Sequence, residues 1–302
     1  MQLLYKSNLL QQYYYQKNSQ AFYLVLRKIK KNRAISMILF DGQLKKMRVF
    51  HNDPIKYQLE YEKQELNVND LIGAEIHIQF GGKINCIKCG RSIKKTYGQG
   101  FCYPCFRDAP EAAECIIKPE LCRAHLGEGR DVEWEEKHHN QPHIVYLANS
   151  STTKVGVTRK TNVPNRWIDQ GASSAIILAE TPNRYEAGRI EVAMKSIFAD
   201  KTNWRKMLSE QVPFDQDLIE TKWELEEQLP EDITQFFTDD EEVIENHFPV
   251  NAFPEKIKSI NLLKQNEIRL PLQGIKGQYL IFTNGFVMNI RNHTGFFITL
   301  SK

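Results

Sequence analysis

The sequence predicts a multi-domain α+β protein, and three observations lead to this fold class. A chain of 302 residues is usually too long to fold around one small hydrophobic core. Stretches that alternate apolar and polar residues, which is typical of strands, occur near both ends of the chain. Two Cys-x2-Cys pairs and a mixture of strand and helix patterns lie between them. We therefore expect, in order, a small β domain, a zinc ribbon, an α/β core, an acidic helical segment and a C-terminal β-meander.

The first expected domain is a small β domain at residues 37–82. Residues 55–61 and 76–80 alternate apolar and polar side chains with a period of two, which favours half-buried strands. Residues 1–36 carry a basic run but no clear amphipathic period. We expect Met37 to be the natural start of the protein, and 1–36 to be an extension that is not native.

Residues 83–142 form a cysteine-rich region with the strongest metal-binding signal of the chain. It contains two Cys-x2-Cys pairs with twelve residues between them. The tight turn within such a pair points both sulfurs to one side, so two pairs can enclose one tetrahedral Zn²⁺. The alternatives are two disulfides, which require an oxidising compartment, or four unrelated buried thiols. We expect a structural zinc ribbon with the ligands Cys86, Cys89, Cys102 and Cys105.

A second metal site is a weaker hypothesis for the same region. Cys115 and Cys122 follow the quartet, and several histidines come after them. Thiolates and imidazoles are the ligands that zinc prefers, but a Cys-x6-Cys spacing has no strong signature. Two buried thiols beside surface histidines are the alternative. The ligands of the second zinc would be Cys115, Cys122, His125 and His139.

Residues 143–210 have the pattern of a compact α/β unit. Two strand-like runs, 144–148 and 154–158, flank a polar four-residue turn, which predicts a hairpin. A short helix beginning at Pro164, a strand at 175–179 and a longer helix after Asn183 are expected to follow. Asn183 and Glu186 have the spacing of a capping box at the start of that longer helix.

The last third of the chain is expected to hold an acidic helical segment, 211–262, and a β-meander, 263–302. Residues 211–250 contain thirteen acidic residues and one lysine. Two alternating runs meet at Asn284-Gly285, and this dipeptide is a strong signal for a hairpin turn.

Composition and charge indicate a cytoplasmic protein with a polyanionic partner. The hydrophobic fraction is 41% and the charged fraction 25%, as in globular proteins, and the net charge is only +3. No apolar run approaches the roughly 20 residues that span a bilayer, and the basic start does not have the form of a signal peptide. Basic residues are concentrated locally: residues 83–107 hold six Lys or Arg and no acid. Such modules favour nucleic acid, while ordinary solvated surface charge is the alternative.

The order of elements in residues 143–208 resembles that of the GIY-YIG nuclease superfamily. Ile144-Val145-Tyr146 stands where this family has Gly-Ile-Tyr, and Lys154-Val155-Gly156 stands where it has Tyr-Ile-Gly. Arg166 corresponds to the arginine of the family's helix and Glu191 to its metal-binding glutamate. The resemblance covers about a fifth of the chain. It departs from the family pattern at Ile144, which replaces a glycine, and at Lys154, which replaces a tyrosine.

The resemblance implies a catalytic role for four residues. Tyr146 would help to activate water, Arg166 would stabilise the charged phosphate, and Glu191 would hold Mg²⁺. Lys154 cannot act as a phenol, but it can contact phosphate. The alternatives are a simple ion pair between Arg166 and Glu191, and a Tyr146 that only packs in the sheet.

Almost all of the chain after Met37 also resembles an uncharacterised bacterial zinc-ribbon family, a domain of unknown function. This resemblance implies no known activity. The stretches that carry it are Cys-Ile-Lys-Cys-Gly (86–90), Gly-Gln-Gly-Phe-Cys-Tyr-Pro-Cys-Phe (98–106), Val-Tyr-Leu-Ala-Asn-Ser-Ser (145–151), Lys-Val-Gly-Val-Thr-Arg (154–159), Arg-Trp-Ile-Asp-Gln-Gly-Ala (166–172), Asp-Lys-Thr-Asn-Trp-Arg (200–205) and Gly-Ile-Lys-Gly-Gln-Tyr-Leu-Ile-Phe (274–282).

Together these features predict a nucleic-acid-processing protein, a Mg²⁺-dependent endonuclease acting on DNA or RNA, with no obligatory protein partner and no membrane contact. We expect Lys94, Lys95 and Arg159 to contact the nucleic acid. One alternative is a non-catalytic, zinc-dependent module that binds DNA or RNA through the same surface. Another is an interaction scaffold that uses the acidic segment.

Overall fold

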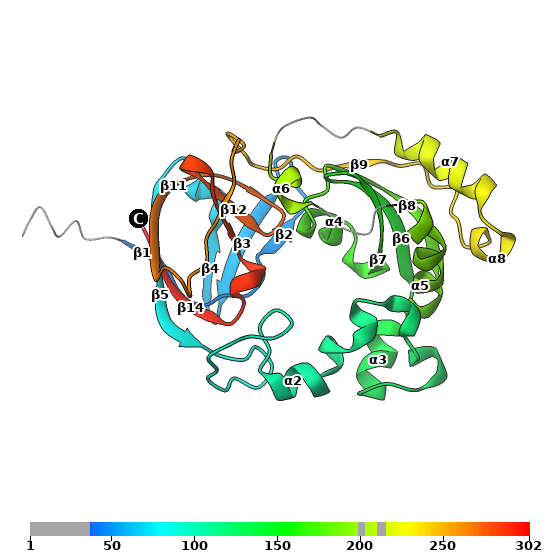
Figure 1. Cartoon of the computed structure of the whole chain (residues 1–302), viewed down its shortest axis with the longest axis horizontal. Helices are drawn as coiled ribbons and strands as arrows, with labels where there is room; N and C mark the ends of the chain where they lie inside the picture. Colours follow the sequence, from blue (N-terminus) through cyan, green and yellow to red (C-terminus); the bar gives the residue numbers. More distant parts are fainter. Residues whose placement is uncertain (1–36, 199–202, 210–215) are drawn as a thin grey trace, which may run out of the picture.

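The structure is a computed structural model that describes residues 37–198, 203–209 and 216–302, so the expected extension at 1–36 lies outside it. Within these ranges the protein is a mixed α+β structure with three sheets and mostly short helices. Figure 1 shows a β-rich part, an α/β part, and a cysteine-rich segment that runs between the two.

The largest sheet combines strands from both ends of the described chain. They are β1 (Ile38–Gln43), β5 (Glu75–Ile84), β10 (Lys258–Ser259), β11 (Glu267–Lys276), β12 (Tyr279–Phe282), β13 (Phe286–Asn289) and β14 (Phe296–Ser301). Their order is β1-β14-β5-β11-β12-β13-β10, and every neighbouring pair is antiparallel except β10 and β13. The sheet is open, with β1 and β10 as its edges.

The strands of 37–82 and 263–302, which the sequence predicts as separate modules, therefore share one sheet. Ile78 of β5 is paired with Leu300 of β14 on one side and with Ile268 of β11 on the other, and all three are buried. A period of two shows which face of a strand is buried but not which strand lies beside it. The predicted hairpin at Asn284-Gly285 is confirmed, since β12 and β13 pair across it.

A second, three-stranded sheet packs against the first. It consists of β2 (Arg48–Phe50), β3 (Lys56–Tyr61) and β4 (Gln64–Asn67), followed by the 3-10 turn η1 (Val68–Leu71). Tyr57 and Leu59 of β3 are buried in the same hydrophobic core as Ile76 and Leu300 of the large sheet. The two sheets therefore form one β part around a single core.

The third sheet belongs to the α/β part and confirms the predicted hairpin. It contains β6 (His143–Asn149), β7 (Thr153–Arg159), β8 (Ser174–Thr181) and β9 (Ile244–Glu245), in the order β7-β6-β8-β9 with antiparallel pairing throughout. The helices beside it are α4 (Asn165–Asp169) and α5 (Arg184–Ala193). Val145 and Leu147 pack in one core with α5, and Tyr146 points into another with Trp167 of α4.

Helix α5 begins where the capping pattern predicts. The side chain of Asn183 accepts a hydrogen bond from the backbone N–H of Glu186 at 3.0 Å, which satisfies a free donor of the first turn. Ala187, Ile190 and Met194 are buried against the sheet. The helix presents Glu191 on a flank of this buried face.

The cysteine-rich segment connects the β part to the α/β part, along the lower side of Figure 1. Its helices are short because prolines and glycines interrupt them. They are α2 (Tyr103–Asp108), η2 (Pro110–Ala112), η3 (Glu114–Ile116), η4 (Pro119–Leu121), η5 (Ala124–Leu126) and α3 (Val132–His139).

The acidic segment packs on the outer side of the α/β part through apolar side chains. Leu218, Leu225 and Ile233 lie in the core of β6 and α5. No helix among the described residues has both the length and the apolar character to cross a membrane. The remaining elements are η6 (Lys160–Asn162), η7 (Met194–Ser196), α6 (Trp204–Met207), α7 (Leu218–Gln228), α8 (Glu231–Thr234), η8 (Thr283–Gly285) and η9 (Arg291–His293).

Candidate metal centres and a basic cleft

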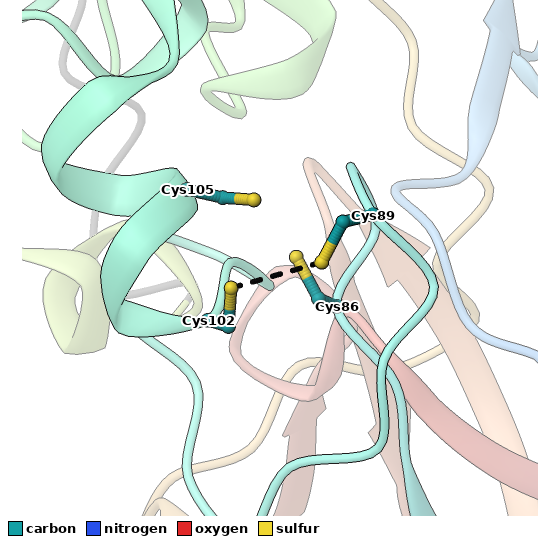
Figure 2. A group of neighbouring side chains, drawn as sticks. All are labelled: Cys86, Cys89, Cys102 and Cys105. Atoms are coloured by element: carbon teal, nitrogen blue, oxygen red, sulfur yellow. Dashed lines mark hydrogen bonds between the residues drawn. The ribbon is translucent and has the colours of Figure 1, made fainter.

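The first candidate metal centre is the cysteine quartet that the spacing predicts. Cys86 and Cys89 lie in the turn after β5, Cys102 caps the N-terminus of α2, and Cys105 lies within that helix. Figure 2 shows the four side chains pointing toward one another, and their sulfurs all lie within 4.8 Å of each other. The quartet could therefore hold one metal ion.

The spacing of these cysteines suits a tetrahedral ion. The sulfurs of Cys89 and Cys102 are 3.8 Å apart, and two thiolates on one zinc are separated by about 3.8 Å, given Zn–S bonds of about 2.3 Å. The backbone N–H of Arg91 donates to Cys89 and, with its cysteine neighbours, lowers the pKa of that thiol to about 6. All six cysteines are free thiols, so the two disulfides considered as an alternative are not formed.

A second group of four ligand-type side chains is buried between η3 and α3. It consists of Cys115, Cys122, Glu135 and His139, whose donor atoms also lie within 4.8 Å of one another. Glu135 and His139 are one turn apart on α3, and the side chain of each is only 3% exposed. In the part of the chain that the structure describes, two separate groups could therefore hold a metal ion.

The structure places Glu135, and not His125, beside Cys115 and Cys122. His125 stacks on the ring of Tyr185 at 4.6 Å and lies outside the group. His139 is in the group, as the sequence predicts. Sequence reasoning missed Glu135 because it considered only Cys and His as ligands, although Glu135 and His139 have the i, i+4 spacing that places both on one face of a helix.

A cleft of about 1060 Å³ lies between the cysteine-rich segment and the α/β part. Residues 111–113 and 116–120 line it from the cysteine-rich segment, and residues of β7, α4 and α5 line it from the α/β part. Lys45 and Lys46, from the loop after β1, and Arg291, from η9, contribute from the β part. All three parts of the fold therefore contribute to this cleft.

The cleft is strongly basic. Among the described residues, eight Lys or Arg and three Glu line it. Several of the cations are already paired: Lys46 binds Asp169 at 2.7 Å, and Lys195 binds Glu120 at 3.2 Å. The basic residues are Lys45, Lys46, Lys118, Lys154, Arg166, Arg184, Lys195 and Arg291.

Three of the four residues expected to be catalytic line this cleft: Lys154 on β7, Arg166 on α4 and Glu191 on α5. Burial raises the pKa of Glu191, although the nearby Lys195 opposes this effect. Burial, together with the charge of Arg166, lowers the pKa of Lys154 to about 8. Both groups therefore sit in an environment that disfavours their charged form and would gain from a bound partner of opposite charge.

Tyr146 does not line the cleft but lies fully buried behind it, beneath Gly156. Its hydroxyl is 2.8 Å from the side-chain amide of Gln170. With the nitrogen of that amide turned toward Tyr146, its oxygen accepts from Nη2 and Nε of Arg166 at 3.0 and 3.2 Å. Arg166 is thus held through Gln170, and no ion pair between Arg166 and Glu191 is present in the described part of the chain.

The three residues expected to contact nucleic acid lie outside the cleft. Lys94 and Lys95 are exposed in the loop between the two cysteine pairs, and Arg159 ends β7, but none of the three lines the cleft. Lys95 packs over the ring of Tyr97 at 5.2 Å. Tyr97 in turn stacks on Phe106, which does line the cleft. The loop is therefore connected to the edge of the cleft through aromatic side chains.

Comparison with known proteins gives one match. No curated protein and no solved structure matches the chain. A family model described as "Protein of unknown function (DUF2797)" matches residues 73–298, which include both groups of metal-ligand residues and every residue that lines the cleft except Lys45 and Lys46. This match covers well over half of the chain, and the chain therefore belongs to that family.

Proposed function

We propose that the protein processes nucleic acid and that the basic cleft binds the phosphodiester backbone of DNA or RNA. The observation that carries this proposal is the gathering of eight Lys or Arg side chains, from separate elements, around one cleft with only three Glu. Clustered cations in a concave site attract a polyanion and raise its local concentration. The overall charge of +3 hides this feature, because thirteen acidic residues lie in 211–250, and none of those that the structure describes lines the cleft.

Glu191 makes phosphodiester cleavage the leading form of this proposal. It is a half-buried carboxylate on the wall of a basic cleft that also contains Arg166 and Lys154. Glu191 would hold a divalent cation such as Mg²⁺, whose charge favours formation of the attacking hydroxide. Arg166, oriented by Gln170, would stabilise the charge that develops on the phosphate. The resemblance of 143–208 to GIY-YIG nucleases supports the same assignment.

The cysteine quartet fits a structural role in this function. We propose that it binds Zn²⁺, because four thiolates in a closed tetrahedral arrangement are typical of structural zinc. Phe101 directly precedes the ligand Cys102, and Phe106 directly follows the ligand Cys105. Both line the cleft. A zinc ion here would hold both rings in place, and the exposed ring of Phe106 could then stack on an unpaired base.

A cleavage assay with matched variants tests the catalytic form. The substrates are single- and double-stranded DNA and RNA, each with and without Mg²⁺ or Mn²⁺. We expect metal-dependent cutting by the wild type and none by Glu191→Gln, which keeps the shape of the side chain but not its charge. Glu186→Gln on the same helix, outside the cleft, should cut like the wild type. Cutting that persists in Glu191→Gln would contradict the assignment.

A non-catalytic nucleic-acid-binding module is the second candidate, and one observation favours it. The hydroxyl of Tyr146 is fully buried and hydrogen-bonded, while a lysine occupies the position of the second tyrosine of the nuclease motif. Neither expected phenol is then available to water. Binding without cutting, with an affinity that falls steeply with salt, would support this candidate. Arg166→Ala should reduce the slope of log affinity against log salt concentration by about one, which corresponds to one lost phosphate contact. Lys264→Ala, which changes an exposed residue outside the cleft, should leave the slope unchanged.

A further inference from the structure

The second group of buried ligand-type side chains, Cys115, Cys122, Glu135 and His139, has the donor geometry of a metal site. Sγ of Cys115 lies 3.8 Å from Nδ1 of His139, and Oε2 of Glu135 lies 3.5 Å from the same nitrogen. A tetrahedral zinc with bonds of about 2.3 Å to sulfur and about 2.0 Å to nitrogen and oxygen separates a sulfur and a nitrogen by about 3.5 Å, and a nitrogen and an oxygen by about 3.3 Å. The observed separations are close to these values before any ion draws the donors together.

All four residues of this group are buried, whereas in the quartet only Cys86 and Cys102 are. Cys115 is 6% exposed and Cys122 2%, and the side chains of Glu135 and His139 are 3% exposed. A buried carboxylate is costly unless it meets a cation or several hydrogen-bond donors, and the two thiols beside it can bind a metal as thiolates. Two sulfurs, one imidazole nitrogen and one carboxylate oxygen are all donors that zinc accepts, and four protein donors are enough for a tetrahedral site.

Surrounding residues hold Glu135 and His139 in place. Oε1 of Glu135 accepts from the backbone N–H of Arg130 at 2.9 Å, which leaves Oε2 facing His139. A Cβ atom on Gly129 would collide with this carboxylate, so a larger residue there would push the Glu135 side chain out of its present position. Trp134 packs edge-on against His139 at 5.2 Å. Supporting contacts of this kind orient the ligands of natural metal sites.

We propose that Cys115, Cys122, Glu135 and His139 bind one Zn²⁺, separate from the ion at the cysteine quartet. This site lies outside the cleft and is independent of the nucleic-acid function proposed above. Its role is to clamp the 116–121 segment, which runs between the two cysteine ligands and forms a wall of the cleft.

The contacts of the 116–121 segment show how the clamp would act on the cleft. Nε of Arg184 donates to the carbonyl of Cys115 at 2.9 Å, and Nη2 donates to that of Ile116 at 3.0 Å. Gly188 of α5 lies directly on the backbone of Pro119 and Glu120, because a Cβ atom there would collide with both. The segment is thus fastened to the zinc ligands at its ends and to α5 along its length.

Native mass spectrometry of the full chain, reconstituted with Zn²⁺ under reducing conditions, tests the proposal. We expect two zinc ions per chain, one for each group of ligands. The double variant Cys89→Ser, Cys102→Ser should retain one zinc ion. One ion in the wild type and none in this variant would overturn the proposal. Two ions in the wild type support the proposal even if the double variant does not fold, because the quartet can account for only one of them.

Two further variants distinguish Glu135 from His125 as the fourth ligand. Glu135→Ala should weaken the second zinc by at least about 10- to 100-fold, measured by competition with a chromogenic chelator, since even outer partners of ligands contribute this much. His125→Ala should leave both affinities unchanged, because its ring stacks on Tyr185. The reverse result would overturn the donor set proposed here. Substitution with Co²⁺ gives an independent test, because the intensity of thiolate-to-Co²⁺ charge-transfer bands reports the number of bound thiolates. In the double variant of the quartet this intensity should fall to that of two thiolates, those of Cys115 and Cys122.

Discussion

Gly156→Ala tests how Tyr146 is accommodated behind the cleft. A Cβ atom at position 156 would lie 2.5 Å from the hydroxyl oxygen of Tyr146 and 2.6 Å from the ring carbon that bears it. The ring cannot swing away, because Tyr146 is fully buried against Trp167 and its hydroxyl is 2.8 Å from Gln170. The substitution must therefore displace the tyrosine or the strand above it.

The expected cost follows from these contacts. Overpacking a buried site costs about 1–3 kcal/mol, and losing the hydrogen bond to Gln170 adds about 1 kcal/mol. Alanine offsets about 0.5–1 kcal/mol of this because glycine weakens a strand interior. We therefore expect Gly156→Ala to lower the free energy of unfolding by about 1–3 kcal/mol and to loosen Arg166, which depends on the same amide of Gln170.

Urea unfolding of a double-mutant cycle with Tyr146→Leu measures this effect. The smaller leucine side chain makes room for the methyl group that Gly156→Ala adds, so the double variant should be more stable than the two single costs predict, by about 1 kcal/mol or more. Gly81→Ala in β5 is the matched control, because its Cβ atom would meet only a carbonyl oxygen at 3.5 Å. Additive costs within about 0.5 kcal/mol, or a neutral Gly156→Ala, would refute the reasoning.

Three further predictions concern stability. Burial lowers the pKa of Lys276 in the folded protein to about 8, whereas a lysine in the unfolded chain has a pKa near 10.4. Between these two pH values only the unfolded chain keeps the proton. The free energy of unfolding therefore rises with pH across this range. Lys276→Met should therefore stabilise the protein by about 1–3 kcal/mol at pH 7, measured by urea unfolding. The difference in unfolding free energy from the wild type should become smaller by pH 9, and an unchanged difference would contradict this reasoning. Arg184→Met should cost about 1.5–3 kcal/mol in the same assay, because two hydrogen bonds from a charged donor are lost, and an unchanged midpoint would argue against their importance. Removing metal with a chelator under reducing conditions should lower the thermal midpoint and expose the cysteine quartet to alkylation, and equal labelling before and after removal would speak against a bound ion.

Local features of the fold were predictable from the sequence. The Asn183 cap, the hairpin at Asn284-Gly285 and the hairpin of 144–158 each depend on residues close together in the chain, and the structure contains all three. The grouping of the first and last β segments into one sheet was not predictable. It depends on pairs such as Ile38 with Ser301, which are far apart in sequence and carry no local signal.

The same distinction between local and long-range features holds for the candidate metal centres and the cleft. The Cys-x2-Cys spacing by itself identified the quartet, because a tight turn positions both sulfurs of each pair wherever the rest of the chain lies. Only the tertiary structure selected Glu135 over His125, since that choice depends on how α3 packs against η3. It also decided that Lys154, Arg166 and Glu191 line one basic cleft together with residues 116–120. The physical reason is that a ligand set or a cleft is formed by distances between elements, which are determined by packing and not by spacing along the chain.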